Sequence, residues 1–294
     1  MVNHWIAAVL AVAGGAIVLV AGGGTPAHAE TVKWVGCDIS KASFLDEVAK
    51  AFEKKTGHKI ESEDGGATRG IRDVVARKAH MGGSCRTGMN VPEEQGVKLI
   101  PVAWDALVVI VHPSNPVSRI TLAQLRGVLA GTITNWKALG GKDVAIQVFA
   151  REGKLSGVGA GTRLLVFGNP DQEFTPKAKI FDSTNPLEEA VEQTPSAVAM
   201  SGISSARLRR LKMLSIEGKS PTRENVINGQ YLLYRPLYLV VPEKPSPVVS
   251  EFTKFVVSSE GQAIVRSTGT VTLAEGKGLW EKYKEQLKHT GKVR

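Results

Sequence analysis

The chain is poor in the residues that most catalytic and metal-binding signatures need. It has two cysteines, six histidines and only 6% aromatic residues. The histidines, at positions 4, 28, 58, 80, 112 and 289, are scattered, and no Ser/His/Asp or Cys/His set can be assembled from them. The sequence also lacks a Walker loop, a His/Cys zinc spacing, heptads and internal repeats. We therefore expect neither a cofactor nor a metal, and a protein that is not an enzyme.

Acidic residues are outnumbered, 28 against 37 Lys and Arg, which leaves a net charge of +9. The basic residues are not interleaved with stacking aromatics, so we expect no nucleic acid as partner. An anionic ligand or acidic partner fits the excess, but so does a solvated surface charge. Much of the excess lies in a C-terminal cluster, Lys277, Lys282, Lys284, Lys288, Lys292 and Arg294.

The N-terminus is apolar from Trp5 to Val20 and then reads Ala27-His-Ala29, which fits the small-x-small rule for signal cleavage. Residues 1–29 are therefore predicted to be a secretory signal peptide cut after Ala29, which places the mature protein in the periplasm. An uncleaved anchor is the alternative, although sixteen residues are few for a membrane span. The segment contains no Lys, Arg, Asp or Glu, so its removal leaves the net charge unchanged.

Strands and helices alternate after residue 30. Residues 32–35 and 58–62 are predicted strands, and residues 44–55 form an amphipathic helix. The glycine-rich turn at 65–70 leads into a second helix through Ala79. This alternation is typical of open parallel sheets, which bind ligands at the carboxyl ends of their strands. Further strands are predicted at 145–149, 197–201 and 237–241.

The most informative stretch is residues 104–141. An apolar run at 106–111 has the composition of a strand buried on both faces, a Pro/Asn/Ser segment stops it, and Thr121 caps a short helix that ends near Gly131. A second informative part of the chain lies near the C-terminus. It comprises residues 221–226, 231–241, Phe252, Phe255 and 259–265.

In this order, the two stretches resemble the hinges and closing helix of periplasmic phosphate-binding proteins of ABC transporters and their wider substrate-binding family. The resemblance covers about residues 31–275. It implies an α/β, two-lobed periplasmic-binding-protein fold (type II), in which each lobe is an open, mostly parallel sheet flanked by helices and a two-strand hinge joins them. Lobe I would comprise residues 30–112 and 237–294, and lobe II residues 113–236. Two crossings between lobes let a cleft close over a ligand.

Four loops match the family's ligand-binding loops in order: residues 36–40, 66–69, 81–86 and 150–163. In the family, backbone N–H groups, hydroxyls and an Arg from the second lobe enclose the anion. Here Ala67 stands where the phosphate binders have Ser, Cys85 where they have Asp, and the fourth loop is longer. The resemblance implies these ligand-binding residues: Asp38, Ser40, Ala67, Thr68, Arg69, Ser84, Cys85, Arg86, Arg151, Ser156, Gly161 and Thr162.

Plainer interpretations of the same residues stay open. The glycine-rich loops could be tight turns only, and Arg86 and Arg151 could pair with nearby acids such as Asp38 or Glu152. In the fourth loop, Ala160-Gly161-Thr162 lacks the family's Ser, and Ser156-Gly157 could take its place.

Cys37 and Cys85 are the only cysteines, and an even count in an exported protein favours a disulfide. The first and third strands of this fold are neighbours, so the loops that follow them can meet. Two spare thiols, or a thiophilic site for a soft metal or arsenite, are the alternatives.

The sequence thus predicts a monomeric solute-binding protein that captures a small oxyanion, phosphate first, and delivers it to an ABC permease. One alternative is a periplasmic sensor for a thiophilic ligand such as arsenite or a soft metal, acting in signalling or redox. The other is an enzyme that uses the same cleft.

Overall fold

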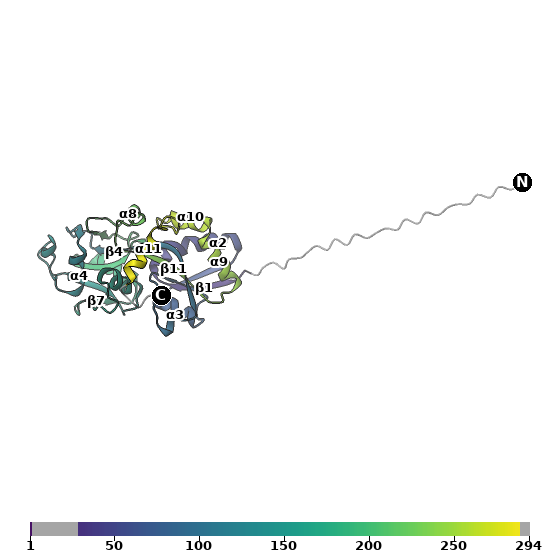
Figure 1. Ribbon diagram of the computed structural model, residues 1–294, viewed down its shortest axis with the longest axis horizontal. Coiled ribbons are helices and arrows are strands. Elements are labelled where there is room, and N and C mark those ends of the chain that lie inside the picture. The colour runs from purple at the N-terminus through teal and green to yellow at the C-terminus, as the bar shows by residue number, and fades with distance from the viewer. Residues whose placement is uncertain (2–28, 289–294) are drawn as a thin grey trace.

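The structure is a computed structural model that describes Met1 and residues 29–288. Residues 2–28 of the predicted signal peptide lie outside this part, and so do Lys292 and Arg294 of the C-terminal basic cluster. Within the described part, no helix has the length and the apolar character needed to cross a membrane. Figure 1 shows an elongated α/β molecule, in which α2, α3, α9 and β1 lie at one end and α4, β7 and α8 at the other.

The strands of the described chain form one large sheet and a small two-stranded one. In the large sheet the order is β2-β1-β3-β11-β4-β8-β6-β7, and β9 pairs with β4 in addition. The strands are β1 (Thr31–Gly36), β2 (Lys59–Asp64), β3 (Met81–Ser84), β4 (Val97–Val111), β5 (Arg119–Ile120), β6 (Gln147–Arg151), β7 (Lys179–Phe181), β8 (Ala197–Gly202), β9 (Lys212–Met213), β10 (Ser215–Ile216) and β11 (Tyr234–Pro242).

Helices connect these strands. The α-helices are α1 (Asp38–Ser40), α2 (Asp46–Thr56), α3 (Gly66–Val75), α4 (Leu122–Ala130), α5 (Gly157–Thr162), α6 (Thr184–Gln193), α7 (Ile203–Ala206), α8 (Arg223–Ile227), α9 (Pro247–Val257), α10 (Ser259–Ser267) and α11 (Leu279–Leu287). Two π-helical segments, η1 (Lys41–Leu45) and η4 (Arg163–Phe167), and two 3₁₀ segments, η2 (Pro92–Glu94) and η3 (Trp136–Leu139), complete the set.

The large sheet has a parallel half at each end and an antiparallel centre. β1 pairs in parallel with β2 and β3, and β6 pairs in parallel with β7 and β8. β11 is antiparallel to both β3 and β4, and β4 is antiparallel to β8. The arrangement is the predicted one, two open parallel sheets joined by two strands.

β4 connects the two halves because it is long enough to pair with different strands along its length. Its first part, up to Ala106, pairs with β11, and Leu107 to Val111 pair with β8. The buried strand predicted at 106–111 is therefore the second part of a strand of 15 residues. Where each lobe begins and ends along the chain stays a prediction.

Local signals in the sequence specify α4. Thr121 caps it by accepting from Gln124 N, the Gln124 side chain accepts from Thr121 N, and Gly131 ends it in the left-handed conformation at φ 82°. The predicted helix from Thr121 to Gly131 is confirmed.

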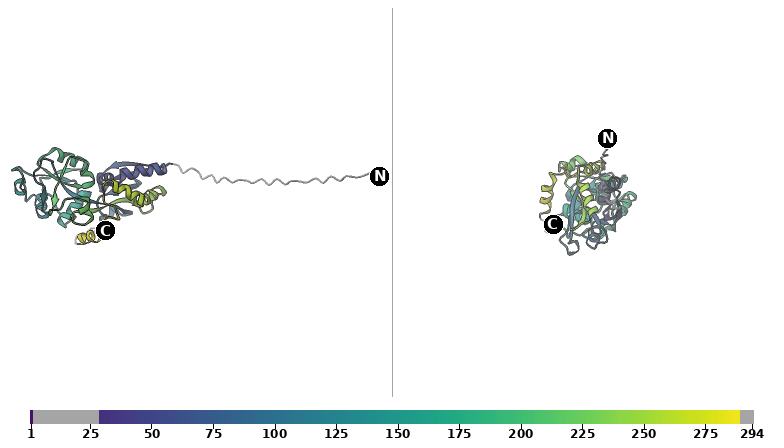
Figure 2. Two further views of the ribbon diagram at one scale, coloured as in Figure 1. Left: turned by 90° about the horizontal axis from the view of Figure 1, so that it is seen from above. Right: turned by 90° about the vertical axis from the view of Figure 1, so that its right-hand side faces the viewer.

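The C-terminal helix α11 packs against the hinge strands. Trp104 in β4 contacts Trp280 and Tyr283 of α11, with ring centroids 4.6 and 5.9 Å apart. Tyr234 in β11 packs on the same Trp104 at 5.9 Å. Figure 2 shows α11 on the outside of the molecule, beside the region where the two halves of the molecule join. The described end of the chain thus covers the outer face of the hinge.

Candidate functional site

The loops that follow β1 and β3 bring the two cysteines together. Gly36 and Gly83 are partners in these parallel strands, so Cys37 and Cys85 leave the sheet at the same edge. Cys37 caps α1: its Sγ accepts from Ser40 N at 3.4 Å and lies 3.1 Å from Ser40 Oγ. A side-chain hydrogen bond joins Cys37 and Cys85.

The predicted disulfide is not present. Both cysteines lie in the described part of the chain, and both are free, buried thiols. Parallel pairing of β1 and β3 brings the two thiols into hydrogen-bond contact but not to the shorter separation of a covalent bond. The expectation that the two loops meet is correct, and the covalent link is not formed in this structure.

The two thiols titrate in opposite directions. The hydrogen bond from Cys37 lowers the pKa of Cys85 to about 7, assisted by the charges of Arg235 and Arg151 and opposed by burial. Burial raises the pKa of Cys37 well above its ordinary value of 9.0, and the charge of Cys85 adds to this. Of the two thiols, Cys85 therefore loses its proton first.

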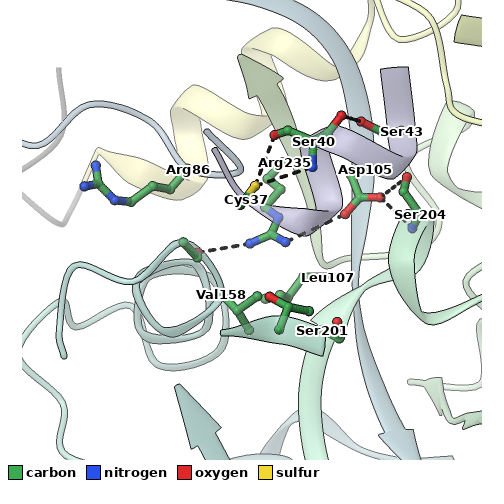
Figure 3. Close-up of polar contacts among 12 residues, drawn as sticks. Cys37, Ser40, Ser43, Arg86, Asp105, Leu107, Val158, Ser201, Ser204 and Arg235 are labelled. Carbon is green, nitrogen blue, oxygen red and sulfur yellow. Dashed lines mark hydrogen bonds and ion pairs between the residues drawn. The ribbon is translucent and has the colours of Figure 1, made fainter. Parts of the chain in front are cut away.

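An ion pair lies beside the thiols, at the hinge. Arg235 in β11 and Asp105 in β4 are cross-strand partners, each 1% exposed, with 3.7 Å between Nη2 and Oδ2. Asp105 Oδ1 accepts from both the N–H and the hydroxyl of Ser204, and Arg235 Nη1 donates to Gly157 O at 3.1 Å. Arg235 Nε and Nη2 have no hydrogen-bond partner among the described residues, nor does Asp105 Oδ2. Figure 3 shows Arg235 between Cys37 and Asp105.

Helix α5 fits closely against this group. A Cβ at Gly157 would lie 2.4 Å from Cys85 Sγ, and one at Gly161 would lie 3.0 Å from Arg235 Nη1. A side chain at Gly157 would push α5 away from the thiols, and one at Gly161 would require Arg235 to shift. Glycine is thus required here by close approach of the two halves of the molecule.

A cleft of about 640 Å³ opens between the N-terminal end of α3 and the loop from β6 to α5. Across it, Thr68 Oγ1 and Arg86 Nε both donate to the Leu155 carbonyl, each at 2.7 Å. The structure is therefore closed across the cleft. Its walls carry four cationic and three acidic side chains and several small residues: Gly65, Gly66, Ala67, Thr68, Arg69, Arg72, Asp73, Arg151, Glu152, Gly153, Lys154, Leu155, Ser156 and Asp182.

Arg151 lines the cleft at the end of β6. Its Nη1 donates to Thr184 Oγ1 at 2.8 Å, Nη2 to Asp182 O at 2.5 Å, and Nε to Phe181 O. These bonds hold the guanidinium rigidly, with Nη2 3.5 Å from where a Cβ on Gly66, the first residue of α3, would lie. A cation from the second half of the sheet thus faces the free N–H groups at the start of a helix in the first half.

Asp38 also bridges the two halves. Its Oδ2 accepts from Thr184 N at 3.0 Å and from Asn185 N at 3.2 Å, at the N-terminus of α6. Burial raises its pKa, with Asp64 adding to the shift, while these two N–H donors and Arg151 oppose it. Asp38 is therefore a contact between the two halves of the molecule in this closed arrangement.

Two of the predicted arginines are paired with acidic side chains. Arg86 is buried in an ion pair with Glu94, whose Oε2 lies 3.0 Å from Nη1, and Figure 3 shows its side chain pointing away from Arg235. Arg69 is exposed and pairs with Glu63 and Asp73. The plainer expectation for Arg86, pairing with a nearby acid, is correct in kind, but the acid is Glu94 rather than Asp38 or Glu152.

The fourth loop places Ser156 at the start of α5, where it is the N-cap residue. Thr162, which is predicted to bind the ligand, lies at the other end of this helix, and its Oγ1 donates to Val158 O. Ser84 Oγ donates to Arg86 O and holds the third loop. Ala67 packs against the Gly157 position and gives the first turn of α3 no hydroxyl.

Arg235 and Asp105 were missed as site residues, although both lie in the stretches that carry the family resemblance. A single charge at the border of each long apolar run was the available signal. Asp105 and Arg235 are 130 positions apart in the chain, and only strand pairing shows that the charges face each other.

Comparison with known proteins agrees with this architecture. The family model described as PBP superfamily domain matches residues 24–260. The chain belongs to the PBP superfamily.

Curated relatives and solved structures narrow the class. The phosphate-binding protein PstS of Borreliella burgdorferi is 27% identical over 249 residues, which cover 82% of this chain and 89% of that protein. PstS of Bacillus subtilis is 25% identical, with 82% and 80% covered. A structure of a candidate phosphate ABC transporter substrate-binding protein with bound phosphate, from Clostridium perfringens, is 29% identical, covers 82% of this chain and 99% of its own, and has a TM-score of 0.73. The two-lobed fold predicted from the sequence is confirmed.

Proposed function

We propose that this protein is a solute-binding protein that captures a small oxyanion, phosphate first, in the cleft between its lobes and releases it to an ABC permease. It acts as a monomer, binds no nucleic acid and turns over no substrate. Relatives named for phosphate binding, which match most of the chain, support this function over a sensor for a thiophilic ligand.

The observation that carries the proposal is the approach of Arg151 to the first turn of α3. The guanidinium is held by three hydrogen bonds to the segment from β7 to α6, and it faces the N-terminus of a ten-residue helix across a polar cleft. A fixed cation opposite free backbone N–H groups attracts an anion from both sides. An anion there links the two lobes and favours the closed form.

The proposal includes export of the protein to the periplasm. The apolar N-terminal segment and Ala27-His-Ala29 support cleavage after Ala29 and a periplasmic location. In that compartment a binding protein collects its ligand and meets the permease. Mass spectrometry of the exported protein should find Glu30 as its first residue, and a chain that retains Met1 or Trp5 would contradict the cleavage.

A thermal-shift screen of the mature protein tests the ligand class. Phosphate, sulfate, arsenate and molybdate are compared with arsenite at equal ionic strength. At a hundred times its dissociation constant, the true ligand adds about 2.7 kcal/mol to the free energy of unfolding. A shift with at least one oxyanion supports the proposal; a shift with arsenite and none with any oxyanion would replace it by the sensor function.

A further inference from the structure

The anion cleft does not account for the pair of thiols at its base. Cys37 and Cys85 are the only cysteines of the whole chain, and they lie in contact at the carboxyl ends of two neighbouring parallel strands. They are 2% and 1% exposed. Isolated buried cysteines act as small apolar residues, but two that touch offer a pair of sulfur ligands.

The surroundings of the pair restrict what it could bind. Among the residues that the structure describes, no group of three or more His, Cys, Asp and Glu side chains is placed to hold a metal ion. Structural zinc needs four protein ligands and catalytic zinc three, so this pair is a poor zinc site. Soft monovalent ions of the copper group are satisfied by two thiolates in a linear arrangement, and thiolate ligands select them.

Charge balance also favours a monovalent ion. A monovalent ion between two thiolates has a net charge of −1, which is costly to bury without a cation. Arg235 lies beside the thiols, is 1% exposed, and has two donor atoms, Nε and Nη2, without a hydrogen-bond partner in the described part of the chain. Asp105 forms an ion pair with this guanidinium at 3.7 Å, without a hydrogen bond between them. The two unused N–H donors of Arg235 are therefore available to the sulfur atoms.

We propose that Cys37 and Cys85 form a two-coordinate site for Cu(I) at the base of the interlobe cleft, stabilised by Arg235 as a cation that the site shares with Asp105. Cu(I) forms two Cu–S bonds, any thiol protons pass to solvent, and no electron is transferred. The site is distinct from the proposed anion site, whose cation is Arg151.

Access to the thiols depends on the lobes. In the closed arrangement Gly157 packs directly on Cys85 Sγ, and Arg235 donates to the Gly157 carbonyl. Cu(I) therefore enters when α5 moves away from the hinge strand. The loading rate should be lower whenever the cleft is held closed.

The test is an anaerobic titration of the reduced mature protein with Cu(I), in competition with the chelator bicinchoninate. We expect one equivalent of Cu(I) per chain, ultraviolet sulfur-to-copper absorption, and two sulfur neighbours by X-ray absorption spectroscopy. The Cys37→Ser and Cys85→Ser variants should each lose this equivalent, while Met81→Leu, which removes a thioether from β3 and leaves both thiols, should keep it. Circular dichroism and thermal unfolding establish that each variant is folded.

The role of Arg235 is tested separately, by the affinity for Cu(I). The Arg235→Met variant should bind Cu(I) less tightly than the wild type, with the stoichiometry and the two sulfur neighbours unchanged. Three results would each overturn the proposal: no Cu(I) retained by the folded wild type against the chelator, an equivalent that survives in the Cys37→Ser/Cys85→Ser double variant, or a sphere of three or four ligands. If Arg235→Met does not fold, the cysteine variants and the measured coordination number still test the proposed Cu(I) site.

Discussion

Arg235 and Asp105 face each other as cross-strand partners of the two hinge strands, yet they are joined by no hydrogen bond. Asp105 accepts hydrogen bonds from Ser204, and Arg235 donates one to the carbonyl of Gly157. Burial raises the pKa of Asp105, and the charge of Arg235 opposes that shift. The pair thus connects the hinge, the thiols and the start of α5.

Removing one partner should be strongly destabilising. Arg235→Met leaves a buried carboxylate without its cation, which costs about 3–5 kcal/mol of unfolding free energy. Urea denaturation measures this loss, and Arg69→Ala, which breaks an exposed ion pair, is the control, with a much smaller effect expected. A loss in Arg235→Met no larger than in the control would show that Asp105 does not need the arginine.

Arg151→Ala should weaken oxyanion binding by at least about 2 kcal/mol, the scale for removing one partner of a buried charge-assisted contact. The affinity of Arg151→Lys should lie between those of the wild type and Arg151→Ala, because lysine keeps the charge but loses the planar guanidinium that can donate two parallel hydrogen bonds. Calorimetry with phosphate measures both. Arg69→Ala is the matched control, since Arg69 lines the same cleft but is paired with Glu63 and Asp73. Equal affinity in wild type and Arg151→Ala would refute the role of Arg151.

The thiol pair should titrate one proton near neutral pH. Ultraviolet thiolate absorbance should show one thiolate forming with a pKa of about 7, that of Cys85, and none from Cys37 until well above 9.0. Because the main lowering cause is the hydrogen bond from Cys37, Cys37→Ala should move this step to higher pH. In Cys85→Ala, no thiolate should appear near neutral pH. An unchanged titration curve in Cys37→Ala would contradict the pairing.

The same titration predicts a pH dependence of stability. A thiol whose folded-state pKa is lowered to about 7 from 9.0 stabilises the fold fully above pH 9, and this contribution is lost as the pH falls through 7. Urea denaturation between pH 6 and 9 should show the wild type gaining stability relative to Cys85→Ala as the pH rises, over roughly the two units between these pKa values. A difference that is independent of pH would exclude a thiolate at Cys85.

Gly157→Ala should hinder closure, because its Cβ would lie 2.4 Å from Cys85 Sγ. We expect weaker oxyanion binding and a larger radius of gyration by small-angle scattering in the presence of phosphate. Cys85→Ala added to Gly157→Ala should restore part of the closure, since it removes the clashing sulfur. If the double variant closes no better than the single one, the clash is not with Cys85.

Local signals explain which parts of the fold could be predicted. Thr121, Gln124 and Gly131 determine α4 through contacts within a few residues, and the apolar run at 106–111 marks a buried strand by composition. In the fourth loop, two positions competed for the family's Ser, and the structure places Ser156 at the N-cap of α5. Placing Gly157 against Cys85 leaves Thr162 at the far end of α5.

The amino-acid sequence by itself determined the order of strands and helices, because capping, periodicity and composition act over short distances. Its resemblance to a known family implied the two hinge stretches and the loops that surround a cleft. It also indicated that the loops bearing Cys37 and Cys85 meet. Only the tertiary structure decided that these thiols stay unlinked, that Arg86 belongs to Glu94, and that Arg235 faces Asp105. These outcomes depend on strand register and on burial, which arise from contacts between residues far apart in the chain.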